Sequence, residues 1–359
     1  MLRARPDEQP ADVIAEAGRV FRSGGIVAFP TETVYGIGVS SASPRALERL
    51  SGIKGRGADK PFTVHLADVP ALYPLVGGLP PLAHRLLNRF CPGPITLVLP
   101  ARDGGTVGVR VPDHRLAQAV LAAADAPVLG TSANLAGAPP ATRPEEVLDA
   151  LGDRVDLLID AGPAREGRAS TVVEVLPDSW RLLREGAIPA DRIQAEAGTV
   201  VLFVCTGNSC RSPMAEALFR RALSERLGVP ADKLAEAGFR ALSAGTAAFF
   251  DGPATAPAIR VLESEGLDLS RHRSRPVTVE LIEEADLIFT MTRDQAAVLR
   301  EWVPLARDRI RLVDPGGHDV PDPIGGPDEQ YRTCARELEG AVREIVARDP
   351  RFAAPPPPQ

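Results

Sequence analysis

The chain has 359 residues, of which 44% are hydrophobic, and its net charge is −6 because 47 aspartates and glutamates outnumber 41 lysines and arginines. This length exceeds one ordinary core and predicts two domains of roughly 150–200 residues each. The acidic balance argues against a protein that coats nucleic acid, since the binding domain of such a protein is normally strongly basic.

The first 18 residues mix acids, bases and prolines without an apolar core segment, so no secretory signal is expected. No run approaches the ~18 consecutive apolar residues of a membrane span. Four scattered cysteines without Cys-x-x-Cys spacing predict neither a disulfide framework nor a structural metal site. We therefore expect a cytoplasmic protein with no structural metal.

The first domain is predicted to be a mixed α/β domain over residues 8–190. Residues 11–23 have apolar side chains at helical spacing, and GGIVAFPTETVYGIG then predicts a buried strand that leaves through Pro30 into a polar turn. Strand-like runs alternate with helical stretches at 114–125 and 143–151. The runs are PITLVLP, VGVRVP, APVLGTSAN and ASTVVEVL, and WRLLREGAI closes the domain.

The polar segment 191–198 is predicted to be a linker, because a new apolar strand, TVVLFVC, follows it. From there, strands alternate with helices at 213–227 and 253–266, with further strands in FRALSAGT, ADLIFTMT and RIRLVDP. This alternation predicts a Rossmann-like parallel sheet with crossover helices over residues 199–347. The proline-rich end, 348–359, is predicted to be a disordered tail.

Two of the three lysines in the chain, Lys54 and Lys60, lie on either side of Arg56 in IKGRGADKPF, although nearly every other cation is arginine. Lysine is a compact point charge that suits mobile phosphate oxygens. With Arg110 and Arg184, these residues predict an electropositive cavity for a polyphosphate or for several anions. A solvated surface loop is the alternative.

The motifs PTETVYGIG, IKGRGADKPF, GVRVP, TSAN and STVVE occur in this order and resemble the threonylcarbamoyl-AMP synthase (YrdC/Sua5-like) family over residues 11–188. The Lys-x-Arg and Ser-x-Asn pairs of that family fall at Lys54/Arg56 and Ser132/Asn134. The resemblance implies a twisted, YrdC-like mixed sheet. It also implies the condensation of L-threonine, bicarbonate and ATP into threonylcarbamoyl-AMP and pyrophosphate, with the product passed to a tRNA-modifying threonylcarbamoyl transferase that makes N6-threonylcarbamoyladenosine.

The same resemblance implies the residues of two binding sites. L-Threonine is expected at Thr33, His65, Arg110, Ser132 and Ser170. ATP, which brings Mg²⁺ with it, is expected at Lys54, Arg56, Lys60, Thr106, Asn134, Thr142 and Arg184. An RNA-binding module is the alternative for the domain, a carbamoyl-transfer enzyme is a third option, and a core histidine is the alternative for His65.

The second domain carries a sharper motif, in which Cys205 and Arg211 bound a loop between a strand and a helix. Backbone N–H groups of this loop and the positive end of the helix dipole point at one spot, where Arg211 can add a bidentate contact to phosphate oxygens. The same field favours a nucleophilic thiolate at Cys205, and Ser212 can donate a hydrogen bond to the sulfur. The loop residues are Thr206, Gly207, Asn208, Ser209 and Cys210.

A general acid for this site is predicted at Asp322 in DVPDPIGGPDEQY, because an Asp-Pro turn before the last helix should lie at the carboxyl edge of the sheet. A buried free cysteine and an ordinary turn are the alternatives for Cys205 and Asp322. Cys210 is either a packing residue or a thiol that captures oxidised Cys205 as a disulfide.

The stretches VLFVCTGNSCRSPMAEAL, SAGT, HRSRPVT, ADLIFTMT and DPIGG resemble the low-molecular-weight protein phosphatases over residues 200–345. The resemblance implies hydrolysis through a phosphocysteine, with Cys205 attacking, Arg211 stabilising the transition state and Asp322 acting as acid and then base, without a metal. Tyrosine-specific members carry an aliphatic residue where this chain has Ser209, whereas protein-arginine phosphatases carry a small hydroxyl residue. Protein phosphoarginine is therefore the predicted substrate, with phosphotyrosine or non-catalytic phosphate sensing as alternatives.

Overall fold

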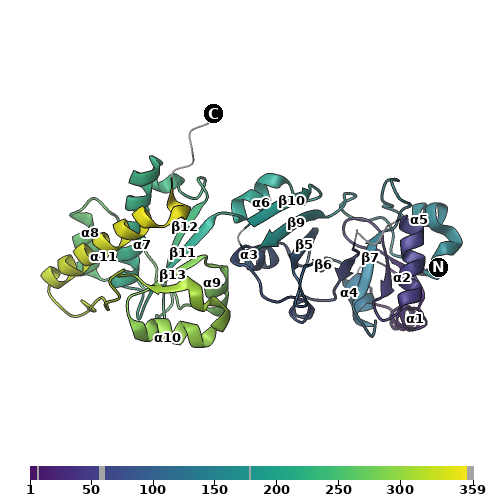
Figure 1. Ribbon diagram of the computed structural model, residues 1–359, viewed down its shortest axis with the longest axis horizontal. Helices are drawn as coiled ribbons and strands as arrows, with labels where there is room; N and C mark the ends of the chain where they lie inside the picture. The colour runs from purple at the N-terminus through teal and green to yellow at the C-terminus, as the bar shows by residue number, and fades with distance from the viewer. Residues whose placement is uncertain (6–7, 56–60, 178, 354–359) are drawn as a thin grey trace. The chain divides into compact units, whose positions relative to one another are not determined.

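The computed structural model describes residues 1–5, 8–55, 61–177 and 179–353 (Figure 1). The chain forms two compact units, Met1–Ile193 and Gln194–Gln359. The division falls inside segment 191–198, which the sequence analysis treats as a linker, and helix α6 (Ala190–Glu196) occupies most of that segment. Within the described ranges, no helix is long and apolar enough to cross a membrane.

The first unit is built on one mixed sheet, to which the described residues contribute ten strands in the order β1-β8-β2-β3-β7-β4-β6-β5-β9-β10. The strands are β1 (Leu2–Arg3), β2 (Val27–Phe29), β3 (Gly36–Ser40), β4 (Thr63–His65), β5 (Ile95–Pro100), β6 (Thr106–Arg110), β7 (Val128–Ser132), β8 (Leu157–Asp160), β9 (Thr171–Leu176) and β10 (Ser179–Arg184). The helices are α1 (Ala11–Arg22), α2 (Pro44–Lys54), α3 (Pro81–Phe90), α4 (Arg115–Ala122) and α5 (Pro144–Leu151), and η1 (Pro70–Leu72) and η2 (Gly152–Arg154) are 3-10 turns. Parallel and antiparallel pairs both occur, which confirms the predicted mixed sheet.

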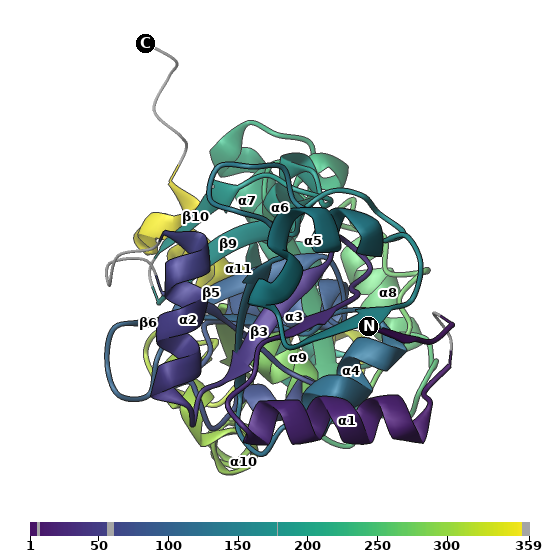
Figure 2. The same ribbon diagram turned by 90° about the vertical axis from the view of Figure 1, so that its right-hand side faces the viewer.

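Helices cover both faces of the sheet around β2, because successive side chains of a strand point to opposite faces. Val27 and Phe29 pack with α1 and α4, whereas Ile26 and Ala28 pack with α2 and α5. Figure 2 looks at this end of the unit, with α1 and α4 side by side and α2 on another side. A strand buried on both faces reads as a continuous apolar run, which explains the sequence IVAF.

The second unit has a parallel sheet in which the described strands run in the order β12-β11-β13-β14, and its pairs are all parallel. The strands are β11 (Thr199–Cys205), β12 (Phe239–Gly245), β13 (Leu287–Thr290) and β14 (Ile310–Leu312). The helices are α7 (Arg211–Leu227), α8 (Ala256–Glu263), α9 (Val279–Glu284), α10 (Arg293–Trp302) and α11 (Asp328–Arg348), with 3-10 turns η3 (Ala231–Lys233), η4 (Pro304–Arg309) and η5 (Pro350–Phe352). The predicted Rossmann-like parallel sheet is confirmed.

Strand β11 is central in this sheet, and its alternate side chains serve two cores. Val201, Phe203 and Cys205 pack in the core formed with α7, α8 and α11. Val200, Leu202 and Val204 pack in the core formed with α9 and α10. The two groups of helices lie on opposite faces of the sheet in Figure 1. Cys205 is therefore delivered, still buried, to the carboxyl edge of the sheet, where sites of open α/β folds assemble.

The predicted disordered tail begins too early. Helix α11 continues to Arg348, and Phe352 in η5 is fully buried with its ring 5.3 Å from that of Phe219. The proline-rich composition of 348–359 concealed this single aromatic anchor, whose burial holds the turn against the core. Residues 354–359 lie outside the described part of the chain.

Candidate active sites

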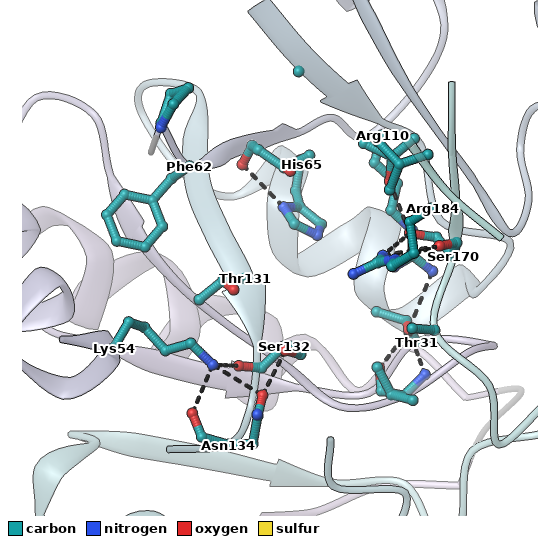
Figure 3. Close-up of a pocket in the computed structure, with 18 of the residues that line it drawn as sticks. Thr31, Lys54, Phe62, His65, Arg110, Thr131, Ser132, Asn134, Ser170 and Arg184 are labelled. Atoms are coloured by element: carbon teal, nitrogen blue, oxygen red, sulfur yellow. Dashed lines mark hydrogen bonds between the residues drawn. The ribbon is translucent and has the colours of Figure 1, made fainter. Parts of the chain in front are cut away.

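A cavity of about 660 Å³ lies over one face of the first unit's sheet, where strand periodicity presents a row of small and polar side chains (Figure 3). Strand β6 contributes every second residue, namely Thr106, Gly108 and Arg110, while its Val109 is buried on the other face. The neighbouring strands β4 and β5 contribute Thr63, His65, Thr96 and Val98 in the same way. The alternation in TVGVR thus places small and polar side chains on the cavity face of β6 and apolar side chains on the opposite face.

Lys54 and Asn134 meet at one wall of this cavity, although 80 positions separate them in sequence. Lys54 Nζ donates to the Ser132 carbonyl at 3.0 Å, to the Asn134 carbonyl at 2.6 Å and to Asn134 Oδ1 at 2.9 Å (Figure 3). Helix α2 ends at Lys54 because Gly55 takes a left-handed conformation with φ 52°. The predicted Lys54–Asn134 cluster therefore exists as a buried cation held by neutral oxygens.

Arg110, at the end of β6, is held at a second wall by the loop between β2 and β3. Its Nη2 donates to Thr33 Oγ1 at 2.5 Å, to Glu32 Oε1 at 3.0 Å and to Thr31 Oγ1 at 3.4 Å. Both members of the Arg110–Glu32 ion pair are buried. Thr31 lines the cavity, whereas Thr33 is enclosed behind Arg110.

Ser170 and Arg184 form a third polar wall. Arg184 Nη2 donates to the Ser170 carbonyl at 2.8 Å and to Ser170 Oγ at 3.2 Å. Ser170 Oγ also lies 2.8 Å from Thr96 Oγ1, so one hydroxyl bridges β5 and β10. Arg184 and Ser170 thus face the cavity beside Arg110 and across from Lys54 (Figure 3).

His65 lies at the centre of the cavity lining as a buried, neutral imidazole. Its Nδ1 donates to the Thr63 carbonyl at 3.2 Å, so Nε2 keeps a lone pair for a ligand hydroxyl or N–H group. Burial, reinforced by the positive charge of Arg110, lowers the pKa of His65 to about 3. The ring also contacts Phe29 edge-on at 5.7 Å, which agrees with the core-histidine alternative, and the ligand role of His65 stays a prediction.

Titration of the protein should reveal this histidine. Because the pKa of His65 is about 3 in the folded chain and 6.5 without burial, the unfolded imidazole binds a proton below pH 6.5 while the folded one does not. The free energy of unfolding should fall as the pH drops from 6.5 towards 3, and less steeply in His65→Gln. Ligand binding to the cavity should show no His65 inflection between about pH 6 and 8; an inflection lost in His65→Gln would contradict this.

Most predicted residues of this site line the one cavity. They are Lys54, His65, Thr106, Arg110, Ser132, Asn134, Ser170 and Arg184. Thr142 does not line it: its backbone N–H and hydroxyl bind Glu146 at the start of α5. Arg56 and Lys60 lie outside the described residues. Sequence reasoning missed Thr31, Glu32 and Thr96, although TET and the alternation within PITLVLP were available as signals.

The second site lies where β11 passes into α7. Cys205 Sγ accepts from the Asn208 backbone N–H at 3.2 Å and lies 3.0 Å from Ser212 Oγ. Asn208 Nδ2 donates to Ser212 Oγ at 2.9 Å, which leaves the serine hydrogen for the sulfur or for the Ala244 carbonyl. Cys205 Sγ thus has a backbone donor in Asn208, and the Ser212 hydroxyl lies within hydrogen-bonding distance of it.

Asn208 gives the loop its shape, because it is a buried non-glycine residue with φ 51°. Its backbone carbonyl accepts from His272 Nε2 at 2.7 Å, and its Oδ1 accepts from the Arg275 backbone N–H at 2.9 Å. The loop also passes close to Gly245, where an added Cβ would lie 2.4 Å from the Thr206 carbonyl. The stretches HRSRP and SAGT therefore act as supports of the loop, a role that residue-level sequence reasoning did not assign.

Arg211 and Asp322 are joined by a hydrogen-bonded ion pair, and Arg211 Nη1 also donates to the Val320 carbonyl at 3.1 Å. Arg211 Nε is buried and has no partner among the described residues. Asp322 is partly exposed, and its Oδ1 caps the turn at the Ile324 N–H. The structure thus brings Cys205, Arg211, Ser212 and Asp322 to the carboxyl edge of one sheet.

The remaining loop residues are anchored individually. Thr206 Oγ1 accepts from Gln295 Nε2 at 3.1 Å, and the Ser209 carbonyl accepts from the Thr255 N–H at 2.9 Å. Gly207 lies between them in the loop. Cys210 is a buried free thiol whose Sγ lies 3.3 Å from Thr255 Oγ1 and 3.6 Å from Tyr331 Oη. These contacts suit a packing residue, and pairing with Cys205 stays a hypothesis.

Together the two units define a two-part α/β protein that combines a polar, cation-bearing cavity with a cysteine-centred anion cradle. The Sua5/YciO/YrdC family model, described as telomere recombination, matches residues 19–186. The low molecular weight phosphotyrosine protein phosphatase family model matches residues 200–349. The chain belongs to both families, the first through its N-terminal unit and the second through its C-terminal unit.

Curated relatives match one unit at a time. Threonylcarbamoyl-AMP synthase of Bacillus subtilis is 39% identical over 52% of this chain, and the threonylcarbamoyl-AMP synthase of Chromohalobacter salexigens is 35% identical over 46% of this chain and 94% of its own length. Protein-arginine-phosphatase of Bacillus subtilis is 38% identical over 41% of this chain and 93% of its own length. The chain spans 57% of the Bacillus subtilis synthase.

Proposed function

We propose that the chain is a bifunctional enzyme whose N-terminal unit forms threonylcarbamoyl-AMP from L-threonine, bicarbonate and ATP. The nitrogen of threonine would bond to the carbon of bicarbonate with loss of water, and an oxygen of the resulting carbamate would displace pyrophosphate at the α-phosphorus of ATP. Relatives of this unit are named threonylcarbamoyl-AMP synthases. The observation that carries the proposal is the convergence of Lys54, Asn134, Arg110 and Arg184 on one cavity.

Each wall of the cavity has a proposed task. Arg110 offers a guanidinium to the carboxylate of threonine, and the neutral His65 offers Nε2 to its hydroxyl or amino hydrogen. The proposed threonine-binding part of the cavity also includes Ser132, Ser170 and the enclosed Thr33. Lys54, Thr106, Asn134 and Arg184 are proposed to hold ATP with its Mg²⁺, where fixed cations offset the charge that develops as pyrophosphate leaves. Arg56, Lys60 and Thr142 remain proposed ATP contacts.

Pyrophosphate release that requires both L-threonine and bicarbonate tests this half of the proposal. Salt-sensitive RNA binding without such release would favour the rival reading as an RNA-binding module. We further propose that the product goes to a cytoplasmic tRNA-modifying threonylcarbamoyl transferase.

We infer that the C-terminal unit hydrolyses protein phosphoarginine. Cys205 would attack phosphorus while Asp322 protonates the departing nitrogen, and Asp322 would then activate the water that breaks the phosphocysteine. Arg211 Nε and the loop N–H groups would hold the equatorial oxygens, and Ser212 would assist the sulfur as it leaves. The observation that carries this half is the contact of Cys205 Sγ with the Asn208 N–H and the Ser212 hydroxyl, together with the Arg211–Asp322 pair.

Ser209 is proposed to decide between phosphoarginine and phosphotyrosine, because a hydroxyl can accept a hydrogen bond from a guanidinium while an aliphatic side chain packs against a phenol ring. We predict that Ser209→Ile lowers kcat/KM for phosphoarginine peptides roughly tenfold or more relative to phosphotyrosine peptides. Side-by-side assays of both peptides with the parent and the variant check this. Faster phosphotyrosine cleavage by the parent would instead support the tyrosine alternative.

A further inference from the structure

Glu32 is a buried acid that no part of the proposed chemistry uses. Its side chain is fully buried in the loop between β2 and β3, and its Oε1 accepts from Arg110 Nη2 at 3.0 Å. Its Oε2 has no hydrogen-bond partner in the described part of the chain. A buried carboxylate with an unused oxygen costs free energy, and an apolar residue in its place would often be more stable. The stability of the fold therefore does not explain why position 32 is a glutamate.

Glu32 helps to hold one end of the Arg110 guanidinium. Within the described residues, Arg110 donates its side-chain hydrogen bonds through Nη2 alone. The acceptors are side-chain oxygens of Thr31, Glu32 and Thr33. Arg110 Nε is buried and has no partner among the described residues. Nη1 makes none of the bonds above, so it is the nitrogen left to donate to a carboxylate in the cavity while the protein holds Nη2.

Glu32 itself does not line the main cavity, so it acts only through Arg110. It faces a second cavity of about 440 Å³, which Thr31, His114 and Arg165 also line. His114 Nδ1 accepts from the Ala117 N–H at 3.3 Å, and burial lowers the pKa of His114, which favours its neutral form. Glu32 thus lies behind Arg110 as the acid in direct contact with its guanidinium.

We propose that Glu32 is a positioning residue that sets the affinity of the cavity for a substrate carboxylate. It fixes the guanidinium through Nη2 and at the same time neutralises part of its charge, so that an incoming carboxylate meets an oriented but weakened cation. Orientation strengthens binding, and the nearby negative charge weakens it. The inference rests on the proposed function in one respect, since L-threonine supplies the carboxylate.

The two effects separate in two variants, whose L-threonine binding can be measured by calorimetry on the full chain. Glu32→Gln keeps an acceptor for Nη2 and removes the charge, so the Kd for L-threonine should fall about threefold or more. Glu32→Ala removes acceptor and charge together and leaves Arg110 Nη2 with the Thr31 and Thr33 hydroxyls as its only acceptors among the described residues, so Arg110 is held less firmly and the Kd should rise about tenfold or more. A merely structural residue is not expected to lower the Kd in one variant and raise it in the other.

Glu174→Gln is the matched control, because Glu174 is also a largely buried carboxylate paired with an arginine. Arg181 Nε donates to Glu174 Oε2 at 2.7 Å, and neither residue lines the cavity. Its threonine affinity should equal that of the parent. Failure of the parent to bind L-threonine would refute the proposed substrate. Binding by the parent with unchanged or equally shifted affinities in both Glu32 variants would refute the role of Glu32 alone. If Glu32→Ala does not fold, Glu32→Asp, which keeps the charge but withdraws the acceptor, should replace it and weaken binding.

Discussion

Replacing Cys205 by serine is expected to lower phosphatase turnover by about 10⁵-fold while leaving threonine-dependent pyrophosphate release unchanged. The loss follows because a serine hydroxyl is a much weaker nucleophile than a thiol, even where it keeps the contacts of Cys205 Sγ with the Asn208 N–H and the Ser212 hydroxyl. Rapid-mixing kinetics with a phosphopeptide should show a burst of product in the parent and none in the variant.

Cys334→Ser is the matched control for this experiment. Cys334 is also a buried free thiol of the second unit, but burial raises its pKa to about 12, which keeps it protonated. Its replacement should therefore leave the burst intact. A Cys205→Ser protein that retains turnover, or a parent that binds phosphate without a burst, would contradict the phosphocysteine route and favour a phosphate-sensing module.

Most of the fold was predicted from the periodicity of apolar residues along the chain. The uninterrupted apolar run of β11 is buried on both faces, and the alternation of β6 reappears as a cavity wall with an apolar back. Both patterns follow from the twofold repeat of a strand, so they are readable from single stretches of sequence. Strands β4 and β8 escaped prediction, although β2 and β14 are equally short or shorter and were predicted, so strand length alone does not explain the difference.

The sites were predictable where the chemistry of a residue is local and unpredictable where it depends on a distant partner. Cys205, Ser212 and Arg211 lie in one loop, so their spacing indicated the cradle. The left-handed backbone at Asn208, by contrast, depends on His272 and Arg275, which only tertiary folding brings close. Glu32 stands in the polar stretch TET, but no local pattern indicated its contact with Arg110, a residue 78 positions away.

The same reasoning explains the choice of lysine at position 54. The buried ammonium donates to three oxygens that converge from one loop, which a compact head with three donors can satisfy and a planar guanidinium cannot. An arginine-rich chain has therefore kept a lysine where geometry requires a point donor. The ammonium of Lys54 also donates to Asn134 Oδ1, so a substitution that removes the charge also removes a contact that orients the Asn134 side chain.

Lys54→Met is expected to lower threonine-dependent pyrophosphate release by about 10³-fold, because it keeps the length of the side chain but removes the charge and the donors that hold Ser132 and Asn134 at the wall proposed for ATP. Lys54→Arg should lose most of the activity as well, since the guanidinium does not fit the site. Lys233→Met is the control: Lys233 is exposed, pairs with Glu236 at 2.7 Å and belongs to the second unit. Phosphatase turnover should be unchanged in all three variants, and a Lys54→Met protein within tenfold of the parent in pyrophosphate release would remove the basis for an ATP site at this wall.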